Sequence, residues 1–169
     1  MGVSALISEQ EYLHSDYQPD CEYADGILIE RHVGEQEHSW LQAALAAYFF
    51  RRRKVWGIHV YTEQRVRIRH KRYLIPDVCV VLGERPPEQV FSSPPLLWIE
   101  ILSPEDQPER VAQKVQEVLA FGVPYVWVID PGTLKSDLHT ASGSRKLEGG
   151  VLRIEGTVIE VPLHSLDED

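Results

Sequence analysis

The chain has 169 residues, of which 43% are hydrophobic and 25% charged, proportions that are typical of one folded domain and too apolar for a disordered chain. Its formal net charge of -9 argues against a general nucleic-acid-binding surface, which carries a surplus of Lys and Arg. No apolar run approaches the roughly 18 residues that cross a bilayer, and Cys21 and Cys79 form no zinc or disulfide motif, so we expect a single cytoplasmic domain over residues 1–169 without a membrane segment.

The first third of the chain predicts a short helix, a strand pair and a long helix. Ser8 followed by Glu11 forms a capping box, which marks a helix start. Residues 21–32 predict strand structure that turns at Asp25-Gly26. Residues 36–54 predict a long helix that ends in four basic residues, because apolar side chains recur at spacings of three and four. The predicted buried stripe of this helix consists of Trp40, Leu41, Ala44, Leu45, Tyr48 and Phe49.

The middle of the chain predicts two strands, over residues 58–70 and 74–82, joined by a basic turn. Within the first of them Arg65, Arg67 and Arg69 alternate with apolar residues, so the three arginines share one strand face. Residues 51–72 hold nine basic side chains against one acid. This arginine strip has two interpretations: a solvated outer face, or a surface that follows a phosphate backbone.

The second half of the chain alternates strand and helix signals. Residues 96–102 are almost wholly apolar, which predicts a strand covered on both faces in the middle of a sheet. A helix is predicted from about 107 to 121, where Gly122 stops it. Residues 125–130 predict another buried strand, and the remainder predicts an antiparallel meander. The element order indicates an α+β (α/β) fold in which helices flank a mixed central β-sheet, with a C-terminal β-meander.

Two carboxylates occupy positions where the strand patterns call for apolar side chains. Asp77 shares a strand face with Cys79, and Glu100 shares one with Trp98 and Leu102. Because an unpaired buried carboxylate is costly, each one needs a cation, a set of hydrogen bonds or a raised pKa. An ion pair with an arginine would account for either residue taken alone.

Lys114 makes these two acids a candidate site. It lies three residues after Val111 and four before Val118, beside the apolar stripe of the 107–121 helix. Its side chain either snorkels at the core edge or reaches the carboxylates, because this helix must fold back over the sheet. Two acids and a lysine at one end of a sheet are typical of phosphoryl hydrolysis, in which the acids hold Mg²⁺ (or Mn²⁺) and the lysine stabilises negative charge.

Several short motifs stand in a fixed order along residues 8–165. They are Glu22-Tyr-Ala-Asp25-Gly26, His38 at the head of the long helix, Pro76-Asp77, Glu100-Ile-Leu-Ser103-Pro104, Lys114 eight residues before Gly122-Val-Pro124, and Trp127-Val-Ile-Asp130-Pro131. In these motifs the chain resembles the restriction-endonuclease-like family of the PD-(D/E)XK nuclease superfamily. The resemblance implies a restriction-endonuclease-like core and a divalent-metal-dependent DNA endonuclease that acts as a homodimer.

The resemblance also implies roles for individual residues. Asp77 and Glu100 would be the metal ligands, and Glu22, placed just before the first strand, would complete the acidic site. In the superfamily a lysine usually stands two residues after the glutamate. That position is Leu102 here, so the resemblance implies that Lys114 replaces the lysine. Around Lys114 the match is imperfect, because positions where relatives often carry Asp and Tyr hold Arg110 and Val118.

Some functional interpretations stay open at this stage. His38 lies on the helix face that packs on the sheet, either as a hydrogen-bonded core histidine or as a group that supports the site or contacts phosphate. The missing lysine at Leu102 and the acidic bulk favour an alternative, a catalytically inactive nuclease-like fold that acts as a dimeric interaction or regulatory module. A paired-carboxylate glycoside hydrolase fits less well, since it gives Lys114 no role.

Overall fold

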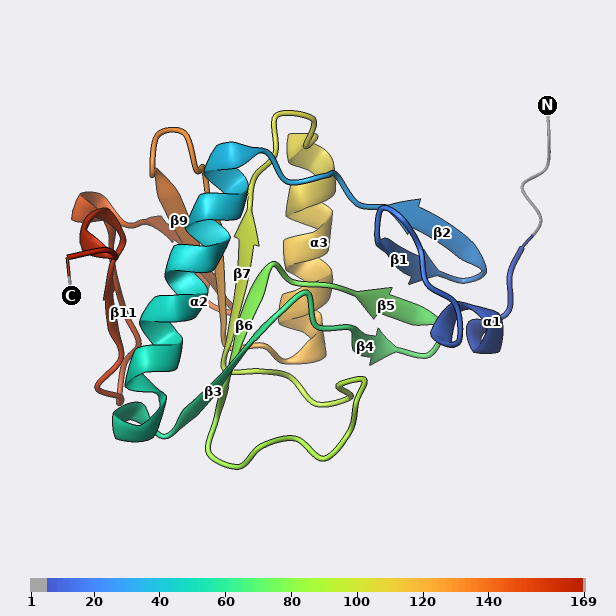
Figure 1. Cartoon of the computed structure of the whole chain (residues 1–169), viewed down its shortest axis with the longest axis horizontal. Helices are drawn as coiled ribbons and strands as arrows, with labels where there is room; N and C mark the ends of the chain where they lie inside the picture. Colours follow the sequence, from blue (N-terminus) through green and yellow to red (C-terminus); the bar gives the residue numbers. More distant parts are fainter. Residues whose placement is uncertain (1–5, 169) are drawn as a thin grey trace.

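The computed structural model describes residues 6–168, so residues 1–5 and Asp169 of the expected domain lie outside it (Figure 1). A six-stranded sheet, in the order β10-β9-β8-β7-β6-β3, forms the centre of the molecule. Only β7 and β8 pair in parallel, so the sheet is mixed. Its strands are β3 (Ile58–Thr62), β6 (Val78–Leu82), β7 (Leu97–Ile101), β8 (Tyr125–Ile129), β9 (Ser136–Thr140) and β10 (Gly143–Lys146).

A smaller antiparallel sheet, in the order β2-β1-β5-β4, projects to one side of the large sheet (Figure 1). Its strands are β1 (Cys21–Ala24), β2 (Ile27–Glu30), β4 (Val66–Arg69) and β5 (Arg72–Leu74). A third, two-stranded sheet pairs β11 with β12. The remaining elements are α1 (Glu9–Leu13), α2 (Gln36–Trp56), α3 (Pro108–Phe121), the 3-10 turns Glu148–Gly150 and Leu163–Ser165, and the strands β11 (Val151–Arg153) and β12 (Glu160–Pro162).

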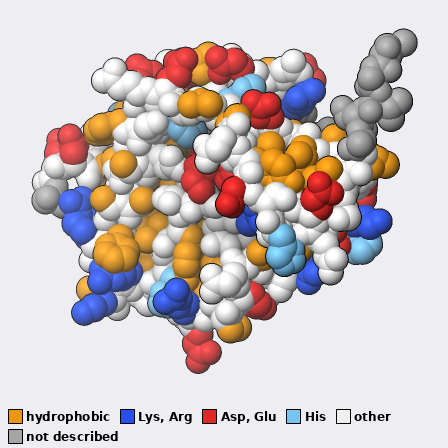
Figure 2. All heavy atoms as spheres, turned by 45° about the vertical axis from the view of Figure 1, so that its right-hand side comes forward, with side chains coloured by type: hydrophobic (Ala, Val, Ile, Leu, Met, Phe, Trp, Pro, Cys, Tyr) orange, Lys and Arg blue, Asp and Glu red, His pale blue; other side chains and the backbone are white. Residues whose placement is uncertain are grey.

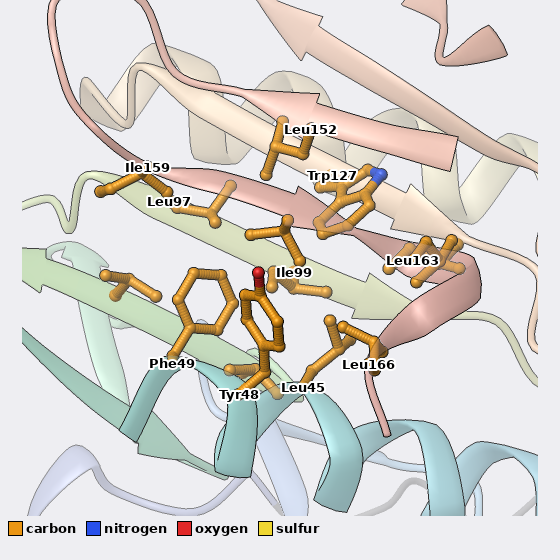
Figure 3. Close-up of a cluster of buried hydrophobic side chains, with 14 of the residues drawn as sticks. Leu45, Tyr48, Phe49, Leu97, Ile99, Trp127, Leu152, Ile159, Leu163 and Leu166 are labelled. Atoms are coloured by element: carbon orange, nitrogen blue, oxygen red, sulfur yellow. The ribbon is translucent and has the colours of Figure 1, made fainter. Parts of the chain in front are cut away.

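The two long helices cover opposite faces of the large sheet (Figure 1). Strand β7 shows why, because Leu97 and Ile99 pack in the core on the α2 side (Figure 3), whereas Trp98 packs with Val115 and Val118 of α3. Side chains alternate along a strand. Glu100 therefore shares the face of Trp98 and is directed towards α3.

The chain passes from the large sheet to the small sheet and back between β3 and β6. The predicted strand over 58–70 is consequently two strands in different sheets, which separate at Glu63, a residue with a left-handed backbone (φ 51). The predicted strand over 74–82 divides in the same way at Pro76, which has no N–H to donate to a sheet ladder. Asp77 lies at this crossing between the sheets.

Other predicted elements match the structure closely or need correction. The predicted helices at 36–54 and 107–121 are confirmed as α2 and α3. Trp40 is half exposed and does not belong to the buried stripe of α2. The C-terminal meander is divided: β9 and β10 extend the large sheet, whereas β11 and β12 form a separate hairpin that packs on the α2 side. Among residues 6–168 no helix is long and apolar enough to cross a bilayer.

Candidate active site

A cavity of about 390 Å³ lies between α3, the small sheet and the ends of β6 and β7. The predicted residues Glu22, Asp77, Glu100 and Lys114 all line it, and His38 lines it as well. The structure thus brings together side chains that come from three strand regions and two helices. Ionisable residues that the sequence analysis did not select as site residues also line it: Glu30, Arg31, His32, Arg72, Asp106, Arg110 and Glu117.

Asp77 is the most buried acid of the cavity, with 3% of its surface exposed. It directly precedes the pair formed by Val78 and Ile99, so the backbone register places it opposite Glu100. Its Oδ2 accepts a hydrogen bond from the backbone N–H of Ile101 at 2.7 Å. Burial raises the pKa of Asp77, but the hydrogen bond from His38 and the charge of Arg31 outweigh it, so the pKa is lowered and the carboxyl is ionised.

Lys114 connects the other two carboxylates. Its Nζ lies 2.7 Å from Glu22 Oε1 and 2.8 Å from Glu100 Oε1. Glu22 is inside strand β1, and not before the first strand as expected; its Oε1 also accepts a hydrogen bond from the N–H of Ile75 at 3.1 Å. Glu100 Oε1 accepts a further hydrogen bond from Trp98 Nε1 at 2.6 Å. Backbone and ring donors therefore fix both glutamates, and the glutamates fix the ammonium.

The protonation of this group follows from burial and from the crowding of acids. Burial raises the pKa of Glu100 to about 7; Lys114 acts against this rise, and the nearby charges of Asp77 and Glu22 add to it. For Lys114, burial lowers the pKa, but the two glutamates outweigh it and raise the pKa above its ordinary value. Lys114 is accordingly charged at neutral pH, and Glu100 can exchange a proton there.

The surroundings of His38 combine features of the two expected interpretations, a core histidine and a group that supports the site. Its Nε2 is 3.4 Å from Asp77 Oδ1, whereas its Nδ1 is buried without a hydrogen-bond partner in the described part of the chain. The hydrogen bond to Asp77 raises the pKa of His38, and burial opposes that rise. The histidine therefore touches a candidate ligand and is not simply a satisfied core residue.

Arg31 is a site residue that sequence reasoning missed. Its Nη2 donates to Asp77 Oδ1 at 2.7 Å, and its Nη1 pairs with Glu63. From α2, Gln42 Nε2 donates to Glu63 Oε1 at 2.5 Å and to the backbone oxygen of Asp77 at 3.0 Å. The one signal in the sequence was that buried Asp77 needs a cation, and among 17 Lys and Arg residues no local pattern selects Arg31.

A second missed pair links the small sheet to α3. Arg72 is buried, and its Nε and Nη2 donate to the two oxygens of Glu117 at 2.7 and 3.0 Å. This two-bond geometry holds a carboxylate in a fixed orientation. Glu117 lies three residues after Lys114 on the same helix, so the pair positions the lysine over the small sheet.

The arginine strip lies away from the cavity. In β4, Val66 and Ile68 pack towards α3, so Arg65, Arg67 and Arg69 are on the opposite face of the small sheet. The Arg65 guanidinium lies 4.5 Å from the centroid of the Tyr12 ring, and Arg69 pairs with Asp25 at 3.3 Å. Figure 2 shows basic and acidic side chains interspersed on the face that it presents, rather than one continuous basic field.

The donor set fits a hard divalent cation. Within residues 6–168 no group of three or more His, Cys, Asp or Glu is arranged to hold a metal ion. Mg²⁺ does not require such a group, because it commonly takes one or two carboxylates and completes its shell with water and substrate phosphate. Asp77 and Glu100 supply two carboxylates on one cavity, and each already attracts a cation, Arg31 in one case and Lys114 in the other.

The buried Glu100 predicts a pH-dependent stability. Its pKa is about 7 in the folded protein and 4.5 without burial. Between these values the folded state retains a proton that the unfolded chain has lost, so this contribution to the free energy of unfolding falls as the pH rises. One proton gives a slope of at most about 1.4 kcal/mol per pH unit. Glu100→Gln should lose this slope.

Urea unfolding of the parent and Glu100→Gln at several pH values between 4.5 and 7 measures the effect. The free-energy difference between the two proteins should change with pH in the stated direction. A difference that stays constant across this range would contradict a raised pKa at Glu100.

The mixed sheet with helices on both faces defines an α+β fold that a solved structure shares. The crystal structure of a "putative nuclease" from Anabaena variabilis superposes on this chain with a TM-score of 0.82 at 20% sequence identity, covering 95% of this chain and 97% of that one. The restriction-endonuclease-like fold expected from the sequence is thus confirmed.

Sequence comparison places the chain in a family. Residues 9–162 match the family described as "Uma2: Putative restriction endonuclease", and the chain belongs to this family. The resemblance drawn from the motifs is confirmed by this match. No curated protein sequence matches the chain.

Proposed function

We propose that the protein is a divalent-metal-dependent DNA endonuclease that hydrolyses phosphodiester bonds. The observation that carries this proposal is the position of Lys114, whose ammonium pairs with Glu22 and Glu100 on the wall of the cavity that Asp77 also lines. The lysine missing from the strand is therefore replaced in space by one from the following helix. Family membership and the nuclease-like fold support the same reaction class.

Each site residue has a distinct part in this proposal. Asp77 and Glu100 would hold Mg²⁺ (or Mn²⁺), which when bound polarises a phosphate and lowers the pKa of a water. Lys114, a partly desolvated cation, stabilises negative charge that develops on the phosphate. Glu22 positions Lys114, and His38 orients the Asp77 carboxylate through its Nε2.

One observation favours the inactive interaction module instead. The Arg31 guanidinium contacts Asp77 and neutralises it without any metal. An active site that has lost its catalytic activity is expected to hold such an ion pair in its acidic cavity, because a buried carboxylate needs a cation. The two functions differ in whether a divalent ion binds at Asp77 and whether DNA is cut.

The test is cleavage of supercoiled and branched DNA by the purified protein with Mg²⁺ or Mn²⁺, and with a chelator as the control. The expected result is nicked or linear product that requires the metal. Metal binding is followed in parallel by calorimetric titration. Intact DNA on every substrate, with metal demonstrably bound, would favour the inactive module.

Charge reversal of the arginine strip is expected to weaken DNA binding. Because Arg65, Arg67 and Arg69 face away from the cavity, their phosphate contacts would lie on DNA that flanks the cut position. The triple Arg-to-Glu variant should bind DNA more weakly, and the slope of log affinity against log salt should fall by about 3. Binding is measured with Ca²⁺ in place of Mg²⁺ at several salt concentrations.

A double Glu variant of Arg145 and Lys146, on exposed strand β10 at the far edge of the large sheet, is the matched control. It changes the net charge without touching the strip. The double variant changes the net charge by four units and the triple variant by six, so losses of affinity in proportion to these changes would show that only overall charge matters. An unchanged triple variant would show that the strip is a solvated face.

The homodimer and the cytoplasmic location are also part of this proposal, as the resemblance and the composition imply them. Sedimentation velocity gives the mass of the particle in solution. A particle with the mass of a single chain at all accessible concentrations would rule out the homodimer.

A further inference from the structure

Arg31 lies at the boundary between the cavity and the surface. Its side chain is 16% exposed and joins two acids: Asp77, which is 4% exposed, and Glu63, which is 41% exposed. Arg31 therefore has one buried partner that lines the cavity and one partly exposed partner that does not line it. It lies in the loop between strand β2 and α2, and its backbone N–H donates to the backbone oxygen of Asp20 at 2.9 Å.

Two other cations of the cavity wall, Arg72 and Lys114, are more firmly held. Arg72 is tied to Glu117 by two hydrogen bonds, and Lys114 to two glutamates. Arg31 makes one hydrogen bond to Asp77 Oδ1, while the other oxygen of Asp77 is occupied by the N–H of Ile101. Oδ1 also lies 3.4 Å from His38 Nε2, so a metal that binds at this oxygen competes with Arg31 beside the histidine.

A guanidinium and a divalent ion cannot share that oxygen at low cost. Two cations a few Å apart in a partly desolvated cavity repel strongly, because the local dielectric is well below that of water. Glu63 remains an ion-pair partner for the Arg31 guanidinium after Arg31 leaves Asp77. Arg31 lines the cavity, and the planar fork of its guanidinium matches the oxygens of a phosphate.

We propose that Arg31 exchanges partners during the reaction cycle: it neutralises Asp77 in the metal-free protein, and yields that oxygen to the divalent ion to bind a DNA phosphate while remaining paired with Glu63. This inference rests on the proposed function. It explains how an arginine pair in the acidic cavity is compatible with an active enzyme, and it assigns a substrate-binding role to Arg31.

Metal affinity tests the first half of the exchange. Calorimetric titration with Mg²⁺ and Mn²⁺ compares the parent with Arg31→Gln, which removes the charge, and with Arg31→Lys, which keeps it. Arg31→Gln should bind metal more tightly, by roughly tenfold or more, since no cation has to be displaced. Arg31→Lys should remain close to the parent. Equal or weaker metal binding by Arg31→Gln overturns the exchange.

DNA affinity tests the second half. With Ca²⁺ bound, Arg31→Gln should bind DNA more weakly, by roughly tenfold, because a charge-assisted phosphate contact is lost. Opposite changes in metal and DNA affinity are the signature of the exchange, and a residue that is only structural would weaken both. Unchanged or tighter DNA binding by Arg31→Gln overturns the substrate role.

A measurement on the parent protein avoids dependence on the folding of Arg31→Gln. The side-chain NMR signals of Arg31, assigned by their loss in Arg31→Lys, should shift when the metal saturates the protein. Unshifted signals at saturation overturn the exchange. If metal binds and displaces Arg31 but DNA is never cut, the exchange stands and the proposed endonuclease fails; if neither the parent nor Arg31→Gln binds metal, both fail.

Discussion

Asp77→Asn is expected to abolish metal-dependent DNA cleavage, with a loss of at least about 10² in rate, because it removes the more buried of the two carboxylates that we propose as metal ligands. Metal affinity should fall as well, since the substitution removes one of the two carboxylates that we propose to hold Mg²⁺. The measurements are cleavage of supercoiled DNA and calorimetric titration with Mn²⁺ on the same samples.

The substitution also carries a cost in stability. Both oxygens of Asp77 accept from donors, Arg31 at one and the N–H of Ile101 at the other, so an amide NH₂ must face one of them. Breaking a fully buried ion pair costs about 3–5 kcal/mol, and the loss here should be smaller because Arg31 is partly exposed and keeps Glu63 as a partner. Unfolding by urea shows how much folded protein is present in each assay.

Asp16→Asn is the control for this substitution, because it removes the same charge at an exposed position that does not line the cavity. It should cleave like the parent. Cleavage by Asp77→Asn at the parent rate, in folded protein, would remove Asp77 from the active site.

Lys114→Ala is expected to reduce cleavage by about 10² while metal binding persists. The ammonium is one of the cations in the cavity and lies in a partly desolvated place, where its loss from the transition state costs on the order of 3 kcal/mol. Lys114→Arg should restore little of the rate, because the planar guanidinium carries its charge differently from a compact ammonium. Single-turnover rates at saturating metal measure the chemical step.

Lys114→Ala has a second expected signature in the metal-free protein. It leaves Glu22 and Glu100 close together without their shared cation, so the apo protein should lose stability and regain part of it when Mg²⁺ is added. Gln116→Ala, on the exposed side of α3, is the control for helix effects. An unchanged rate in Lys114→Ala would exclude the lysine from catalysis.

Local pattern was sufficient where neighbouring residues decide the structure. The α3 boundaries followed from an early proline and from Gly122, whose left-handed backbone (φ 110) ends the helix. The buried strand β7 followed from its apolar run. Both signals act within a few residues, so they do not depend on how the rest of the chain is arranged.

The same kind of pattern failed between residues 58 and 82, where the chain changes sheet twice. A period of two is the same in either sheet, so alternation cannot tell which partner a strand will find. The breaks at Glu63 and Pro76 depend on strand pairing: β3 pairs with β6 at the far end of this segment, and β5 pairs with β1, which lies much earlier in the chain. The arginine strip was placed on one strand face correctly, but only the packing of Val66 and Ile68 on α3 decided that this face is turned away from the cavity.

The sequence by itself determined that Asp77, Glu100 and Lys114 are ionisable residues in apolar surroundings. Each one stands at or beside a position where the local strand or helix pattern calls for an apolar side chain. Only the tertiary structure decided their partners: Lys114 reaches Glu22 across 92 positions of the chain, and Arg31 reaches Asp77 across 46. An ion pair depends on distance in space, and side chains this far apart in sequence meet only when the two sheets and α3 have packed.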